Sequence, residues 1–122
     1  MPAFVRGLCF AVIAWAAFAG AASAHTHLEA SVPAAGTTVA PPSEIKLTFS
    51  EPVEAALSQI SLQSKTGAAV EVRKVAADPA NKAVLVLPLD KPLAPGSYTV
   101  DWRVVSADTH KMRGTFSFEV KP

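Results

Sequence analysis

The sequence predicts an all-β domain, a seven-stranded sandwich or barrel with Greek-key connections of the immunoglobulin-like kind. The first observation is a series of short runs of alternating or β-branched residues, separated by proline, glycine, aspartate and asparagine. The second is that no amphipathic helical pattern stands out after residue 24. We expect strands over residues 28–32, 44–49, 59–63, 69–75, 82–87, 97–105 and 112–120.

Alternation within these runs predicts which side chains form the core. In a strand, every second side chain points to the same face, so apolar residues that alternate with polar ones line the interior. The core-facing residues predicted in this way are Ile45, Leu47, Phe49, Tyr98, Val100, Trp102, Val104, Phe116 and Phe118. The aromatic residues are therefore assigned to packing and to no chemistry.

The first 24 residues are typical of a Sec-type signal peptide rather than of folded structure. Arg6 precedes an apolar run over residues 8–18, and small residues end the segment at Ala22, Ser23 and Ala24. An uncleaved membrane anchor is the alternative, although the apolar run is shorter than the roughly 20 residues that a membrane span requires. We expect cleavage after Ala24 and export from the cytoplasm.

Cleavage leaves residues 25–122 as a single domain without a lipid anchor. An anchor on Cys9 is not expected, because Leu8 stands where a small residue should precede the cysteine. Removing 24 residues from 122 leaves 98, with 10 basic residues once Arg6 is lost and 10 acidic ones. A formally neutral domain has no electrostatic reason to bind nucleic acid or anionic lipid. Loss of the one cysteine also excludes disulfides and thiolate ligands, and we expect a monomer.

Three histidines and one aspartate are the residues from which chemistry is expected. The histidines are His25, His27 and His110, and the last lies in the motif Asp108-Thr109-His110. A free N-terminal histidine binds metal through its α-amine and its ring, while Asp108 and His110 would leave the same face of an extended chain. These nitrogen and oxygen donors favour one Cu(II) per chain in a square-planar array over tetrahedral Zn(II). The alternative is that these histidines are exposed on the surface and bind no metal.

His27 leaves a second arrangement open. A free amine, two deprotonated amides and a histidine at the third position form a square-planar chelate for Cu(II) or Ni(II), which would use residues 25–27 alone. Strand pairing would hold the amides that must lose their protons, so His27 is interpreted as an auxiliary ligand. Met112 does not make a Cu(I) site by itself, because soft Cu(I) requires two or three sulfur donors.

The segments HTHLEASVPAAGTTVAPPSEIKLTFSEPVE and LAPGSYTVDWRVVSADTHKMRGTFSFEV resemble the CopC family of bacterial periplasmic copper-resistance proteins. The matching elements are the starting histidine, the S-x-P-x-x-G turn at 31–36, the strand end F-S-E-P-V at 49–53, the Y-x-V-x-W strand and the D-x-H motif. The resemblance implies a Greek-key β-sandwich or barrel of cupredoxin-like topology. It also carries the Cu(II) ligands onto His25, Asp108 and His110, with His27 as a further candidate. Relatives often have glycine at the position of Thr109, whose branched side chain resists positive φ.

The resemblance further implies a binding protein without turnover. Such a protein would buffer Cu(II) in the periplasm or deliver it to an inner-membrane transporter of the CopD type. A copper monooxygenase with a histidine brace is the enzyme alternative. It is disfavoured because such enzymes have a flat aromatic surface for substrate, whereas the aromatic residues predicted above are assigned to the core. A metal-free immunoglobulin-like structural module is the third hypothesis, and copper binding by the processed protein would exclude it.

Overall fold

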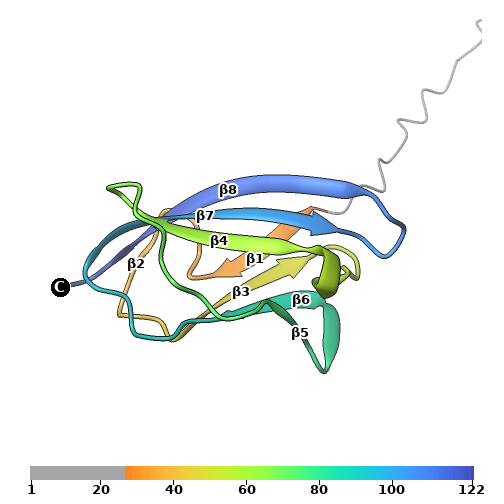
Figure 1. The fold of residues 1–122 in the computed structure, drawn as a ribbon, viewed down its shortest axis with the longest axis horizontal. Coiled ribbons are helices and arrows are strands. Elements are labelled where there is room, and N and C mark those ends of the chain that lie inside the picture. The colour runs from red at the N-terminus through yellow and green to blue at the C-terminus, as the bar shows by residue number, and fades with distance from the viewer. Residues whose placement is uncertain (1–26) are drawn as a thin grey trace, which may run out of the picture.

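A computed structural model describes residues 27–122, so the expected signal peptide and His25 lie outside the described residues. Two four-stranded sheets pack face to face (Figure 1). The first has the order β1-β3-β6-β5, with bounds Leu28–Val32, Glu44–Phe49, Asn81–Pro88 and Ala76–Asp78. The second has the order β2-β8-β7-β4, with bounds Thr38–Val39, Lys111–Val120, Gly96–Val105 and Gln59–Ser64. A turn of 3-10 helix, η1 (Ala55–Leu57), precedes β4. No helix within residues 27–122 is long and apolar enough to cross a bilayer.

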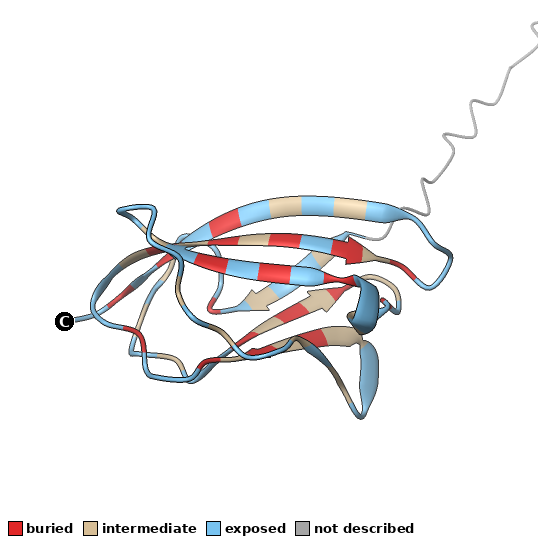
Figure 2. Cartoon of the chain, in the orientation of Figure 1, coloured by how far each residue is buried: buried red, intermediate tan, exposed pale blue. Residues whose placement is uncertain are grey.

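Alternating side chains form the core between the two sheets, as the sequence predicts. Figure 2 shows buried residues alternating with exposed ones along β4 and mainly with half-buried ones along β7. All nine core-facing residues predicted above are buried. The Phe49 ring from the first sheet meets the Trp102 ring from the second edge to face, with centroids 5.3 Å apart. The aromatic residues therefore join the two sheets.

The expected strand over residues 69–75 is wrong, and the described residues form eight strands rather than seven. The segment crosses between the sheets instead, because Ala69 bridges Gln63 of β4 and Val72 bridges Leu89 just beyond β6. Its valines are partly buried against the core, which explains the alternating pattern without a hydrogen-bonded ladder. The paired strand of this region is β5. The short strand β2, which pairs in parallel with the end of β8, was not expected.

The hairpin of β7 and β8 carries the Asp108-Thr109-His110 motif at its tip. Its two strands are fully paired, from Gly96 with Val120 to Val105 with Lys111. Gly114 of β8 lies opposite Trp102, and a Cβ atom built on this glycine would stand 2.4 Å from the indole ring. The indole thus fills the space that a side chain at position 114 would need, and the hairpin is closely packed near its tip.

Candidate metal centre

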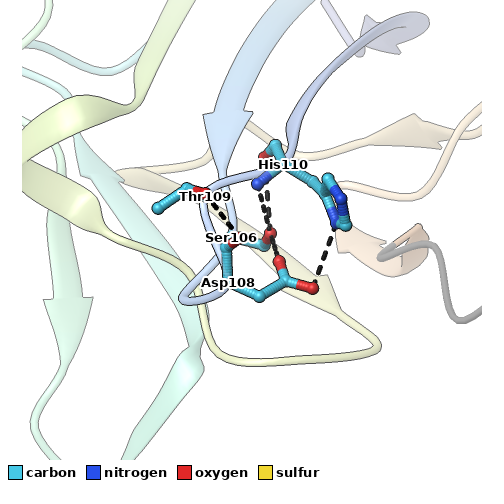
Figure 3. Close-up of polar contacts among 4 residues, drawn as sticks. All are labelled: Ser106, Asp108, Thr109 and His110. Carbon is cyan, nitrogen blue, oxygen red and sulfur yellow. Dashed lines mark hydrogen bonds and ion pairs between the residues drawn. The ribbon is translucent and has the colours of Figure 1, made fainter.

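The Asp108-Thr109-His110 motif lies in the tight turn between β7 and β8 (Figure 3). The Thr109 amide donates to the Ser106 carbonyl and the Ser106 amide donates to the His110 carbonyl, each at 2.9 Å. The expectation of an extended chain is wrong here, because Thr109 has a φ of 72° and the chain reverses direction. Thr109 adopts this left-handed conformation despite its branched side chain, and its hydroxyl donates to the Asp108 carbonyl at 2.6 Å.

The side chains of Asp108 and His110 meet on the solvent side of this turn. His110 Nδ1 lies 3.0 Å from Asp108 Oδ2, and the two side chains are 62% and 52% exposed for histidine and aspartate respectively. Two donors bound to one ion at about 2.05 Å lie about 2.9 Å apart at a right angle and about 3.3 Å apart on a tetrahedron. The contact is an ion pair or hydrogen bond with a proton on Nδ1. The same spacing suits neighbouring ligands on one small cation that displaces this proton, and the exposure of the pair leaves it open to exchange.

A buried serine holds both residues from the core side. Ser106 is fully buried, its hydroxyl donates to the Asp108 carboxylate, and its oxygen accepts the His110 amide at 3.2 Å. The hydrogen bond from Ser106 is the main cause that lowers the pKa of Asp108 below its ordinary value of 3.8. Loss of hydration opposes this shift, and the neighbouring His110 adds to it. Asp108 is therefore ionised, and ready to bind a cation, throughout the neutral range.

Ser106 is the residue of this site that the sequence analysis missed. The signal was its position, because it follows Tyr98, Val100, Trp102 and Val104 at the same two-residue spacing and so extends the core-facing side of β7. A serine at a core position needs a hydrogen-bond partner. In this protein the partners lie in the turn that immediately follows.

His27 lies just before β1, where its backbone is tied to Ser50. Its amide donates to Ser50 Oγ at 2.9 Å, and the Ser50 amide donates to the His27 carbonyl at 2.9 Å. The chelate formed by residues 25–27 alone would require this amide to lose its proton. The observed hydrogen bond opposes that arrangement.

Residues 50–53 connect the start of β1 with the turn that carries Asp108. Ser50 holds His27, the Pro52 carbonyl accepts the Ala107 amide at 3.0 Å, and Val53 pairs with Ser106. The beginning of β1 and the β7-β8 turn accordingly lie at the same end of the sandwich (Figure 1). Within residues 27–122, no three histidine, cysteine, aspartate or glutamate side chains gather closely enough to hold a metal ion by themselves.

Comparison with known proteins identifies the family. The family model described as the CopC domain matches residues 28–121. The chain belongs to the CopC family. Copper resistance protein C of Xanthomonas campestris pv. juglandis is 39% identical over an alignment of 124 positions, which covers 95% of this chain and 97% of that protein.

Two solved CopC-type structures share the fold. The crystal structure of CopC from Methylosinus trichosporium OB3b has a TM-score of 0.75 at 36% identity and covers 80% of this chain and 95% of that one. PcoC of Escherichia coli, described as a methionine-rich copper resistance protein, has a TM-score of 0.72 at 39% identity and covers 80% of this chain and all of that one. The family resemblance and the all-β sandwich are therefore confirmed, as is the expectation of a binding protein rather than an enzyme.

Proposed function

We propose that this protein binds one Cu(II) ion in the periplasm and buffers or carries it as part of copper resistance. The observation that carries the proposal is the 3.0 Å contact between His110 Nδ1 and Asp108 Oδ2, held on the core side by Ser106. Relatives named for copper resistance support copper as the ion. The exposure of the pair suits a carrier, because an ion held there can be taken up and released without unfolding the core.

The remaining donors are assigned to His25 as the first residue of the processed chain. Its α-amine and ring would add two nitrogens to the His110 nitrogen and the Asp108 oxygen, a set that favours Cu(II). Residues 50–53 bring the start of β1 to the end of the sandwich that carries the turn. His25 precedes His27 by two residues, which span at most about 7 Å. The ring of His27 is assigned an auxiliary role.

The proposal specifies Cu(II) rather than Cu(I). Met112 is the one methionine after the expected signal peptide, whereas the related PcoC is described as methionine-rich. Met112 is partly buried and packs against the core. A single thioether in that position does not supply the two or three sulfur donors that Cu(I) requires. We further propose that the protein acts as a monomer and passes its ion to an inner-membrane transporter of the CopD type.

Equilibrium dialysis of the chain beginning at His25 tests the proposed site. We expect one Cu(II) per chain, a large loss of affinity in His110→Ala and in Asp108→Asn, and a small change in the matched variant His27→Ala. If His110→Ala bound copper as tightly and with the same visible spectrum while His27→Ala lost it, the ion would be held by the N-terminal chelate. The absence of copper binding would favour the metal-free structural module.

A further inference from the structure

The outer face of the sheet β2-β8-β7-β4 has a concentration of positive charge next to the candidate metal centre. Arg103 of β7 and Arg113 of β8 are direct cross-strand partners, and Lys111 begins β8. All three side chains are exposed, and none forms an ion pair with another residue in the range 27–122. Like charges directly opposite each other weaken a sheet. The stability of the fold therefore does not explain this arrangement.

The three cations surround a hollow of about 370 Å³ that also has apolar side chains in its lining. Leu57, the last residue of η1, contributes from one side and is 65% exposed. In the described part of the chain, Val32 is the other large hydrophobic residue with a comparable exposure. Val105, which is partly buried and lies on the same face as Arg103, adds to the apolar part of the lining. Figure 1 shows that η1, the end of β7 and the start of β8 lie at the same end of the sandwich.

We infer that this surface, made of Leu57, Arg103, Val105, Lys111 and Arg113, docks an acidic protein segment that carries an apolar side chain. The hollow receives the apolar side chain, and the carboxylates of the segment face the three cations. Arginines around an apolar anchor are typical of the residues that dominate protein interfaces. Because Val105 and Lys111 flank residues 106–110 in the chain, a partner docked here lies beside Asp108 and His110.

The distribution of charge favours a protein partner over an anionic membrane. Residues 25–122 carry 10 basic and 10 acidic side chains, so the domain as a whole is not attracted to a negative surface. Recognition of anionic lipid uses clusters of about 4–8 lysines and arginines, and this surface has three. Asp101 also lines a small hollow next to Arg103 and Arg113. This carboxylate repels a uniformly negative surface but can orient a segment of mixed charge.

The docking surface is argued without the metal. The inference rests on the proposed function only in assigning docking a purpose, which is to bring a copper-accepting protein to the proposed copper site. The test therefore uses the metal-free protein that begins at His25, labelled for NMR. The probe is a short synthetic peptide with aspartates on both sides of a central leucine. We expect saturable shifts of amide signals at Leu57, Arg103, Val105 and Lys111 that weaken as salt is added.

Variants separate specific docking from general attraction of charge. The double substitution Arg103→Gln with Arg113→Gln should weaken peptide binding about tenfold, whereas the matched change of two exposed lysines, Lys65→Gln with Lys74→Gln, should not. The arginine variant should fold as stably as the parent, because a repulsive pair is removed. Leu57→Ser, and a peptide with serine in place of leucine, should each weaken binding about tenfold.

Three results would overturn the inference. These are equal affinity in the two double variants, amide shifts elsewhere on the domain, or binding to phosphatidylglycerol vesicles in place of the peptide. Copper dialysis of the same variants keeps the two proposals distinguishable, because loss of the surface should leave Cu(II) affinity unchanged. If the protein bound the peptide but not copper, the docking surface would stand and the proposed function would fail.

Discussion

Removing the Ser106 hydroxyl should loosen the attachment of the proposed copper ligands Asp108 and His110 to the core. The hydroxyl is fully buried, donates to the Asp108 carboxylate and accepts the His110 amide. The substitution Ser106→Ala keeps the backbone bond from the Ser106 amide to the His110 carbonyl and removes the side-chain bonds alone. We expect the Asp108 and His110 side chains to lose their fixed relative position.

Ser58 offers a matched control for the loss of a buried hydroxyl. It is 8% exposed, its hydroxyl donates to the Glu54 carbonyl at 2.7 Å, and its oxygen accepts the Val105 amide at 3.2 Å. Each alanine variant removes an oxygen that accepts a backbone amide, so each should lower the free energy of unfolding by about 1–3 kcal/mol. Ser106→Ala alone should also weaken Cu(II) binding, by about 10–100-fold, as expected when a residue that orients a ligand is lost.

The pH dependence of stability gives a second readout of the same substitution. The Ser106 hydrogen bond is the main cause that lowers the pKa of Asp108 from its ordinary 3.8, so the pKa should rise towards that value in Ser106→Ala. A lowered carboxyl pKa stabilises the folded protein above the ordinary value, and this contribution disappears as the pH falls through the lowered pKa. The stability difference between parent and Ser106→Ala should therefore narrow below about pH 4, whereas the difference for Ser58→Ala should not.

Urea unfolding at several pH values and copper competition at neutral pH measure these effects. Asp108 is ionised at neutral pH in both proteins, so any loss of copper affinity there reflects the position of the ligands rather than their protonation. The reasoning would be refuted if Ser106→Ala and Ser58→Ala bound copper equally well, or if their stabilities changed with pH in the same way.

Four further predictions concern the ligands and the turn. Mass spectrometry of periplasmic protein should find a chain that starts at His25, and one extra residue before it should weaken Cu(II) binding at least about tenfold, because the chelating amine is lost. Competition with Cu(I) chelators should show weak binding, and Met112→Ala should leave Cu(II) affinity unchanged; strong Cu(I) binding lost in this variant would contradict the assignment. Affinity for Cu(II) should fall as the pH is lowered, since protons compete with copper for nitrogen donors, and titration of His110→Ala should show a weaker dependence on pH because one such donor is removed. Thr109→Asn should raise the free energy of unfolding by about 0.5–1 kcal/mol in urea, because asparagine tolerates the φ of 72° better than a branched residue; a loss of stability would show that the threonine hydroxyl outweighs the strain.

The core of this fold could be predicted from the sequence because burial in a strand follows a period of two. Ile45, Leu47 and Phe49 show the pattern plainly, and all three are buried. The same pattern was misleading at residues 69–75, where the chain crosses from one sheet to the other and still buries alternate valines. Periodicity reports which side chains face the core, and it does not report which backbone groups are paired. A two-residue strand such as β2 is too short to show a pattern at all.

The residue types of the candidate site could be predicted from the sequence, but the backbone conformation of its turn could not. Asp108 and His110 were recognised because carboxylate and imidazole are good metal ligands, and the structure brings them within 3.0 Å. The positive φ of Thr109 runs against the preference of its side chain. It is stabilised by the Ser106 contacts across the turn and by Pro52 and Val53, which lie far away in the sequence. Interactions of this kind appear only once the chain is folded.

The contact between Gly114 and Trp102 means that the residue allowed at one position depends on the residue at the other, although neither is a proposed metal ligand. Gly114 does not have the positive φ that requires glycine, so only the indole packed on it excludes a side chain. Position 114 should therefore tolerate alanine or a larger residue in relatives whose position 102 has lost its indole, and not in those that keep it. A lone Gly114→Ala change would push Trp102 aside, and Trp102 shares the core side of β7 with Ser106. Natural variation at positions 102 and 114 should therefore be correlated. A requirement for the hairpin tip to keep its shape would in this way also restrict the glycine inside β8.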